Sequence, residues 1–195
     1  MVQYGLYCKT IKNLGTEKHY QLLLDGTSLR TFGCFGLTEL GHGSNVRGIE
    51  TTAEYDQDAD EFIINSPTKT SIKFWIGNLA KTAQNGVMFA QLIVKGENKG
   101  VHALVFPIRD RSNHIPLPGI EIGDCGDKLS AQGVDNGWIK FDNYRVPRDA
   151  LLDKFGSVDK DGNYHTSISD DGKRFANSIA SLSGGRVIIG RLSTE

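Results

Sequence analysis

The sequence is short of several features that mark particular classes of protein. Its three cysteines, Cys8, Cys34 and Cys125, are odd in number and widely spaced, which suits neither a disulfide scaffold nor a zinc site. Basic residues number 22 against 23 acidic ones, so the chain lacks the positive charge that a nucleic-acid backbone requires. No apolar run approaches the roughly 18 residues of a membrane-spanning helix. The charge balance argues against nucleic acid as a partner, and the short apolar runs argue against a membrane span. The number and spacing of the cysteines predict reduced, structural thiols in an intracellular compartment.

Two further absences concern export and metal binding. The first residues, MVQYG, do not form a basic stretch followed by an apolar one, so we expect no secretory signal. Residues 159–163 (DKDGN) open like a calcium loop, but Tyr164 stands where glycine is needed and Asp170 where a bidentate glutamate is needed. The histidines show no ligand spacing; they are His19, His42, His102, His114 and His165. We therefore predict no metal site.

Residues 31–150 carry a series of short β-strand patterns. Seven segments rich in β-branched and aromatic residues are separated by Gly, Asn, Asp and Pro: GIETTAEY, EFIIN, SIKFWI, GVMFAQLIV, GVHALVFPI, GIEIG and GWIKFDNYRV. Hairpin turns are expected at DQDADE, at KGENKG and at the DNG before Trp138. The pattern predicts a mainly β fold, an antiparallel barrel or sandwich built as a meander.

The two ends of the chain differ from this centre. Residues 15–24 (GTEKHYQLLL) predict a short helix, with Thr16 as its cap and Gly26 just beyond its end. After Pro147 the periodicity fades, and we expect a polar linker over residues 151–172 and a helix from residue 173 to 195. The chain therefore resembles the centre of a longer protein, with residues 1–30 and 173–195 as the edges of helical domains.

A glycine-rich stretch, LGHGSNVRG (residues 40–48), raises the question of ligand binding. A dinucleotide-binding turn would be followed by a helix, whereas a β-pattern follows here, so a Rossmann turn is excluded. His42 and Ser44 are adjacent to glycines but lack the flanking pattern of a nucleophile elbow. Two interpretations stay open: an ordinary glycine-rich loop, or a loop whose backbone N–H groups, with the hydroxyls of Thr38 and Ser44, approach an anionic or polar ligand.

A second segment, IKFWIGNLAKTAQNGV, places two aromatic residues at the end of an expected strand. Neighbouring residues on a strand face opposite ways, so one of Phe74 and Trp75 can enter the core while the other faces a ligand. Gly77 adds no side chain where the strand ends. The alternative is that both aromatics are half-buried core residues.

Together these segments resemble a known family. CFGLTELGHGSNVRGIETTAEYD, EFIINSPTKTSIKFWIGNLAKTA, GVHALVFPIRD, LPGIEIGDCGDK, DNGWIKFDNYRVPRDALL and KRFANSIASLSGGRV occur in order. The series is similar to the middle of the peroxisomal acyl-CoA oxidases, the oxidase branch of the acyl-CoA dehydrogenase superfamily. The resemblance runs from about Leu14 to Val187. It implies an antiparallel β-barrel between two helical domains, with FAD against the barrel.

The resemblance also implies a role for particular residues. Thr38, in the TEL motif, is expected to hydrogen-bond the pyrimidine side of the flavin. Gly43 and Ser44 match the loop near the FAD diphosphate. Trp75 and Gly77 match the strand end beside the reactive edge of the flavin. The related dehydrogenases usually have threonine in place of Gly77, and we hypothesise that its missing side chain helps O2 reach the reduced cofactor.

The implied activity belongs to the complete enzyme. It desaturates a fatty acyl-CoA at C2–C3 and reduces O2 to H2O2 in a peroxisomal homodimer. The catalytic base of the family is a glutamate in the C-terminal helical domain, and no residue of this chain matches it. Glu39 belongs to the TEL motif, and Glu50 lies in a strand pattern where exposure is expected. We expect this chain alone to be inactive and to bind FAD weakly, because its site is open on one side.

Two departures and two alternatives limit the comparison. The family's tryptophan pair with Pro-Gly-Gly is here Phe74-Trp75-Ile76-Gly77-Asn78, and the C-terminal residues are not a Ser-Lys-Leu address. One alternative is an acyl-CoA dehydrogenase that passes electrons to a flavoprotein. The other is a non-catalytic β-module that binds a ligand or protein surface.

Overall fold

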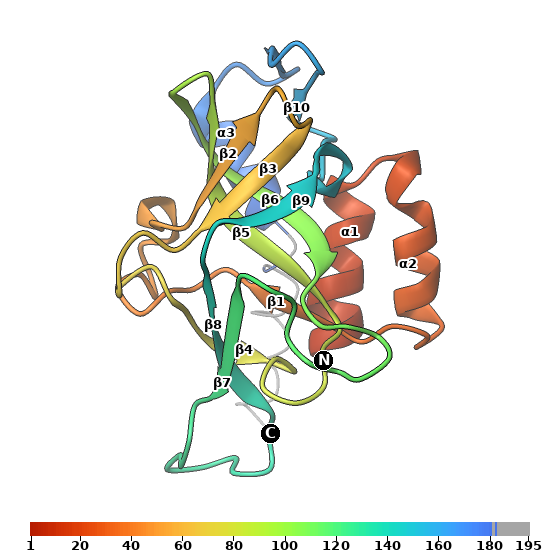
Figure 1. The fold of residues 1–195 in the computed structure, drawn as a ribbon, viewed down its shortest axis with the longest axis vertical. Coiled ribbons are helices and arrows are strands. Elements are labelled where there is room, and N and C mark those ends of the chain that lie inside the picture. The colour runs from red at the N-terminus through yellow and green to blue at the C-terminus, as the bar shows by residue number, and fades with distance from the viewer. Residues whose placement is uncertain (181, 183–195) are drawn as a thin grey trace, which may run out of the picture.

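The computed structural model describes residues 1–180 and 182, and its centre is a hairpin of two long strands, β5 (Asn85–Val94) and β6 (Glu97–Pro107) (Figure 1). The turn between them contains Gly96 at a φ of 76°, which a residue without a side chain adopts at no steric cost. The expected hairpin at KGENKG is therefore confirmed.

The other edge of β5 is shared by two strands. β1 (Gly33–Gly36) pairs with the first part of that edge and β2 (Thr52–Asp56) with the last part, and both pairings are parallel. β2 continues into the expected hairpin with β3 (Glu61–Asn65), and β3 pairs with β9 (Tyr144–Pro147). The mainly β prediction is confirmed, but the simple antiparallel meander is wrong at β5. The loop that follows β1 carries the chain forward along the same edge of β5. β2 therefore runs in the same direction as β1, and both strands are parallel to β5.

A second, three-stranded antiparallel sheet completes the curled half-barrel. Its central strand, β8 (Asn136–Phe141), lies between β4 (Lys73–Gly77) and β7 (Ile120–Asp124). Asn136 and Gly137 pair with β4 and β7 inside β8, so the turn expected at DNG is wrong. The chain instead reverses over residues 125–135.

β5 is buried on both faces, and this divides the interior into two clusters. Met88, Ala90 and Leu92 point into the barrel, while Val87 and Phe89 point to the other face of the sheet. On that outer face lies a helical hairpin, visible beside the sheet in Figure 1. The near-continuous apolar run of this strand follows from its burial on both sides.

The helical hairpin begins earlier than expected. A helical segment, η1 (Val2–Cys8), continues into α1 (Lys9–Leu14), and a short turn, η2 (Glu17–His19), leads into α2 (Tyr20–Thr27). The prediction of one helix over residues 15–24 was therefore too short, and Gly26 lies inside α2. Tyr7, Ile11 and Leu14, which have helical spacing, supply the apolar face that packs on β1 and β5 and give the sequence signal that was missed.

Thr16 and Gln3 hold this hairpin in place. The backbone N–H of Thr16 donates to His19 Nδ1 at 3.0 Å, as a capping residue does, and its hydroxyl donates to Asp153. Buried Gln3 donates to the carbonyls of Gly26 and Thr31 and accepts from the N–H of Gly33. Gln3 therefore ties the first helix to the start of β1.

The segment after β9 is less uniformly polar than predicted. A short turn, η4 (Arg148–Ala150), leads to Leu151 and Leu152, which are both buried. β10 (Ser157–Val158) and β11 (Tyr164–His165) form a small hairpin, and residues 159–163 are its turn. The boundaries expected at residues 30, 150 and 172 stay a prediction.

The last element is α3 (Asp171–Ile179), which starts two residues before the expected helix. The carboxylate of Asp170 caps it by accepting from the N–H of Lys173 at 2.8 Å. The rest of the helix predicted up to residue 195 lies outside the described residues, apart from residue 182.

Three sequence expectations concern features of the whole chain. The cysteines are free, and Cys8 and Cys34 are buried, as expected of structural thiols. Within residues 1–180 and 182, no helix has the length and apolar character needed to cross a bilayer. Among the same residues, no group of three or more His, Cys, Asp or Glu side chains could hold a metal ion.

Candidate functional site

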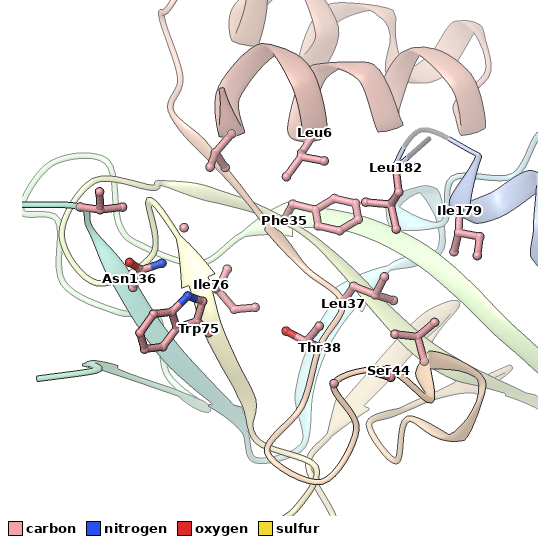
Figure 2. Close-up of a pocket in the computed structure, with 15 residues that line it drawn as sticks. Leu6, Phe35, Leu37, Thr38, Ser44, Trp75, Ile76, Asn136, Ile179 and Leu182 are labelled. Carbon is pink, nitrogen blue, oxygen red and sulfur yellow. The ribbon is translucent and has the colours of Figure 1, made fainter. Parts of the chain in front are cut away.

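A cavity of about 550 Å³ lies where the two sheets, the first helix and the end of α3 meet. Figure 2 shows Trp75, Ile76 and Asn136 on one side of it, and Ile179 and Leu182 on another. Its full lining is Val2, Leu6, Phe35, Leu37, Thr38, Gly43, Ser44, Val46, Trp75, Ile76, Gly77, Val134, Asn136, Ile179 and Leu182. All five residues expected at a cofactor site, namely Thr38, Gly43, Ser44, Trp75 and Gly77, line this one cavity.

The glycine-rich loop, residues 37–51, owes its position to the edge of β5. It leaves the sheet after β1 and returns at β2, and both strands pair with that same edge. A short turn, η3 (Val46–Gly48), lies near its end. The side-chain amide of Gln91 in β5 donates to the carbonyls of Arg47 at 3.0 Å and Ile49 at 2.9 Å. The loop is therefore anchored at both ends and along its return.

Thr38 is joined to β4 by two reciprocal hydrogen bonds. Its hydroxyl donates to the carbonyl oxygen of Phe74 at 2.9 Å, and the N–H of Phe74 donates to the Thr38 carbonyl at 3.2 Å. The Thr38 side chain is half-buried and lines the cavity. A ligand that needs the hydroxyl proton must therefore compete with the Phe74 carbonyl, whereas the hydroxyl lone pairs stay available.

Behind Thr38 lies a fully buried ion pair that sequence reasoning did not find. The Nζ of Lys73 lies 2.8 Å from Oε1 of Glu39, and neither side chain is exposed to solvent. Burial lowers the pKa of Lys73 to about 8, and the Glu39 carboxylate opposes that shift, so the lysine is charged at neutral pH. Lys73 is the first residue of β4, and the residues that follow it are apolar and aromatic. Nothing in that pattern indicates a buried charge at the start of the strand.

Glu50 differs from its expected exposed strand position. It is half-buried and precedes β2, and its carboxylate accepts hydrogen bonds from Thr68, Thr70 and His42. These hydrogen bonds hold the pKa of Glu50 below its usual value, and the bond from Thr68 has the largest effect. Glu50 therefore fastens the outer side of the loop to residues 68–70.

The tip of the loop is the most open part of the site. Gly43 and Ser44 are exposed, and a Cβ built on Gly43 would meet no atom within 4 Å. Both residues line the cavity mouth. The space beside this backbone is therefore free for a ligand that the other cavity walls also contact.

Trp75 lies in a β-bulge, and this corrects the expectation for the aromatic pair. The register of β4 shifts between Lys73 and Ile76, and Trp75 has a φ of 65°, which is rare for a bulky residue. The indole is 54% exposed, and its ring centroid lies 6.2 Å from that of half-buried Phe74. The two aromatics therefore do not face opposite ways, because the bulge breaks the alternation.

Gly77 faces the N-terminal helix as well as the cavity. A Cβ built there would lie 2.8 Å from Cγ2 of Val2. Val2 itself lines the cavity beside it. The space that a missing side chain would leave at Gly77 is therefore partly taken by Val2.

Several lining residues had no signal in the sequence. Leu6 comes from the first helix, Asn136 from β8, and Ile179 from α3, all far from the two motifs along the chain. Asn136 accepts a hydrogen bond from Lys128 Nζ at 3.1 Å, and the same ammonium lies 5.9 Å from the Trp75 ring centroid. Only the fold brings these residues to the site.

The arrangement suits a flat, partly polar molecule. One wall is apolar, the loop offers hydroxyls and open backbone, and an exposed indole can cover a ring. The two carboxylates closest to the motif, Glu39 and Glu50, are both engaged in hydrogen bonds within the protein. The chemistry provided by these residues is therefore binding and orientation.

Comparison with known proteins gives consistent matches. A family model described as "Acyl-CoA dehydrogenase, middle domain" matches residues 34–144. "Acyl-coenzyme A oxidase 2, peroxisomal" of Arabidopsis thaliana is 48% identical over an alignment of 193 residues, which covers 95% of this chain and 28% of the relative. The crystal structure of acyl-coA oxidase1 from Yarrowia lipolytica superposes with a TM-score of 0.89 at 40% identity, covering 95% of this chain and 27% of that one.

A third match is a structure that contains bound ligands. Acyl-CoA oxidase-2 of Caenorhabditis elegans, described as bound with FAD, ascaroside-CoA and ATP, has a TM-score of 0.87 and 34% identity. It covers 93% of this chain, which in turn covers 27% of that structure. The chain thus spans between a quarter and a third of the length of these relatives.

Proposed function

Because this chain belongs to the acyl-CoA dehydrogenase middle-domain family, we propose that it is the FAD-binding middle part of an acyl-CoA oxidase. The observation that carries the proposal is that Thr38, Gly43, Ser44, Trp75 and Gly77 line one cavity. These residues come from two segments more than 30 positions apart along the chain. A shared ligand explains this convergence better than an ordinary surface loop would.

The residues present fit FAD in chemistry and in size. A volume of about 550 Å³ falls within the range of roughly 300–1,000 Å³ that is usual for ligand pockets. Phe35 and Leu37 offer an apolar surface for a ring system, and the hydroxyls of Thr38 and Ser44 offer polar partners. The open space beside Gly43 suits the close approach of a diphosphate to backbone N–H groups.

Each residue then has a distinct task. Thr38 hydrogen-bonds the pyrimidine side of the flavin: its lone pairs accept from a ring N–H, and its hydroxyl stabilises negative charge there when it turns from the Phe74 carbonyl to donate to the ring. Gly43 and Ser44 hold the diphosphate, and Trp75 covers the ring beside Gly77. This chain's residues therefore bind and orient the cofactor and exclude water from one of its sides.

The proposed reaction of the complete protein desaturates a fatty acyl-CoA at C2–C3 to the trans-2-enoyl-CoA and reduces O2 to H2O2 in fatty-acid β-oxidation. FAD, when bound, supplies the acceptor for the hydride that leaves the β-carbon. We assign no catalytic base to the described residues. The carboxylate of Glu39 accepts bonds from Thr51 and Lys73, and Glu50 accepts bonds from Thr68 and Thr70. The base is expected in the C-terminal helical domain of the complete protein.

The cellular setting follows from the same family. Relatives named as peroxisomal occur in plants and mammals, and we place this protein in the peroxisome on that ground. The complete enzyme is proposed to be a homodimer. Fatty acyl-CoA and O2 are its substrates.

The hypothesis that Gly77 helps O2 reach the flavin needs a modified test. Since a side chain at Gly77 would meet Val2, Gly77→Thr should be combined with Val2→Ala to avoid a clash. The rate of reoxidation by O2 in the complete protein is expected to fall in the double variant and not to fall in Val2→Ala alone, which enlarges the space beside Gly77. Unchanged reoxidation in the double variant would contradict the hypothesis.

Titration of this chain with FAD tests the proposed function. Flavin fluorescence should be quenched with a weak dissociation constant, because the cavity is open on one side. Ser44→Ala should weaken binding, whereas Ser112→Ala, another exposed serine remote from the cavity lining, should not. Absence of FAD binding by the wild-type chain and by the complete protein would overturn the proposal.

An assay on the complete protein separates the oxidase from the dehydrogenase alternative. The oxidase should form stoichiometric H2O2 from an acyl-CoA in air without an added electron acceptor. A dehydrogenase would need an artificial acceptor and would form little peroxide. A non-catalytic β-module would do neither.

A further inference from the structure

The Glu39–Lys73 ion pair lies directly behind two walls of the cavity. Glu39 follows Thr38 in the loop, and Lys73 precedes Trp75 by two residues in β4. Both side chains are fully buried, and neither lines the cavity. The pair can therefore act on a ligand only through the two segments that it joins.

The hydrogen bonds around Glu39 require a carboxylate. Its Oε1 accepts from Lys73 Nζ at 2.8 Å, from the Thr51 hydroxyl at 2.6 Å and from the Thr51 N–H at 3.0 Å. Its Oε2 accepts from the N–H of Glu50 at 2.6 Å. Only an ionised carboxyl group offers two oxygens that accept without donating. An amide in this place would set its NH2 group against a backbone N–H.

Lys73 connects the same two segments from the other side. Besides Glu39, its ammonium donates to the carbonyl of Leu37 at 3.3 Å. Beside it run the reciprocal Thr38–Phe74 bonds, and the N–H of Leu40 donates to the carbonyl of Ile72 at 2.9 Å. Residues 37–40 and 72–74 are thus held together by charge and backbone bonds over their whole length.

Stability alone does not account for this pair. The transfer of two charges out of water costs several kcal/mol per ion in general, and well-packed apolar residues are often at least as stabilising. What the pair adds is geometry, because four donors directed at one carboxylate permit a single arrangement of the loop. A role in fixing register is the best-attested use of a buried ion pair.

We propose that Glu39 and Lys73 are positioning residues that fix the register and separation of the cavity walls carrying Thr38 and Trp75. The inference rests on the proposed function for the identity of the ligand, FAD. The positioning itself can be measured without any ligand. Two experiments follow, one for each part.

The first experiment measures hydrogen exchange of the Phe74 amide, which bonds to the Thr38 carbonyl. In Glu39→Gln and in Lys73→Met, this amide is expected to exchange at least about tenfold faster relative to the amides of the β2–β3 hairpin. Leu92→Ala is the matched control: it lies away from the cavity lining and opposite Ala53 of β2, so it should not speed exchange of the Phe74 amide more than that of the hairpin amides. If Lys73→Met fails to fold, Glu39→Gln carries the test alone.

The second experiment measures FAD binding by the full chain, with fluorescence titration for affinity and visible circular dichroism for the geometry of the bound flavin. Glu39→Gln and Lys73→Met should each weaken binding about tenfold and alter the dichroism. Because the pair acts as one unit, the double variant should bind no more weakly than the worse single variant. Leu92→Ala should stay within about twofold of wild type when both are folded.

The outcomes separate the inference from the function on which it rests. If Glu39→Gln leaves both Phe74 exchange and FAD affinity at wild-type values, the positioning role is overturned. If the wild-type chain and the complete protein bind no FAD, the proposed function fails, and the exchange result still decides whether the pair positions the two segments. Equal losses of FAD affinity in Glu39→Gln and Leu92→Ala would also overturn the inference, because they would reflect stability alone.

Discussion

Two buried regions of this molecule, one apolar and one polar, differ in the number of side chains that hold them together. The apolar core inside the barrel, which includes Phe62, Leu92 and Phe141, is made of many side chains whose packing is shared. The polar core under the glycine-rich loop consists of Glu39, Thr51 and Lys73. In the first, each contact is one of many, whereas the second is held by a few directed hydrogen bonds, four of which meet at the Glu39 carboxylate.

This difference suggests a division of tasks between the two cores. Apolar packing is non-directional and tolerates adjustment by neighbouring side chains. Charged hydrogen bonds permit one geometry and leave a large penalty when a partner is lost. We therefore expect loss of a partner in the polar core to lower both stability and the order of the site, and truncation in the apolar core to lower stability alone.

The largest expected effect comes from Lys73→Met in the polar core. It leaves the Glu39 carboxylate buried without a counter-charge, and loss of one partner of such a pair typically costs about 3–5 kcal/mol. Urea unfolding at pH 7 measures the change. In Glu39→Leu/Lys73→Met the charge penalty is absent, so the double variant should recover part of the loss. A double variant less stable than Lys73→Met would contradict the account.

Leu92→Ala is the corresponding change in the apolar core. The side chain is fully buried, and its truncation should cost about 3 kcal/mol through lost transfer free energy and a cavity. Unfolding at pH 7 and FAD titration give the two readouts. The free energy of unfolding should fall while FAD affinity is retained, whereas Glu39→Gln, which leaves the Lys73 ammonium buried without its counter-charge, should lower both. Loss of FAD affinity in folded Leu92→Ala would erase the distinction between the two cores.

The buried residue His102 in β6 is a source of pH sensitivity outside the polar core. Its Nδ1 lies 3.0 Å from the Gly100 carbonyl and its Nε2 lies 2.9 Å from the Tyr164 hydroxyl, so the neutral ring donates to the first and accepts from the second. Burial lowers the pKa of His102 to about 4.

The sign of the effect follows from that lowered pKa. The unfolded chain takes up a proton near pH 6.5 and the folded chain near pH 4, so stability is full above pH 6.5 and falls as the pH drops. Between pH 7 and pH 5 the loss from this group should be about 2 kcal/mol. Urea unfolding at both pH values in wild type and His102→Gln measures it. An equal pH dependence in both proteins would contradict the assignment.

The smallest expected effect on stability is that of Gly43→Ala at the loop tip. No atom lies within 4 Å of the added Cβ, so the free energy of unfolding should change by no more than about 0.5 kcal/mol. FAD binding should weaken, because the methyl group would occupy the open space that we propose for the diphosphate. Gly137→Ala is the control, since its Cβ would lie 2.7 Å from the backbone nitrogen of Ala80 and should destabilise the fold. Unchanged FAD binding in Gly43→Ala would remove the loop tip from the site.

Of the two buried regions, the apolar core was easier to predict from the sequence. Strands such as EFIIN alternate because Phe62 and Ile64 face the barrel, and short turns such as KGENKG carry their own signal. The family resemblance of the motifs around Thr38 and Trp75 supplied the five expected site residues, and the fold brings all five to one cavity, while their contact with a cofactor stays a prediction.

The polar core and the pairing of β5 could not be read from the sequence. Glu39 and Lys73 are 34 positions apart, and nothing local distinguishes a buried charge from a solvated one. In the parallel pairings, residues 37–51 return to the edge of β5, where Gln91 donates hydrogen bonds to residues more than 40 positions away, and such long-range contacts leave no local signal. The bulge at Trp75 likewise reflects pairing of β4 with β8 and overrides the alternation expected of a strand.

The most direct test of the account is to map FAD contacts by amide chemical-shift changes in this 195-residue chain. On addition of FAD, the largest changes should fall on Thr38, Gly43, Ser44, Trp75 and Gly77, with little change in α2 or in the β10–β11 hairpin. Glu39→Gln should reduce these changes at the same FAD concentration. Shifts concentrated in α2 or in the hairpin, with the five cavity residues unmoved, would contradict the central claim.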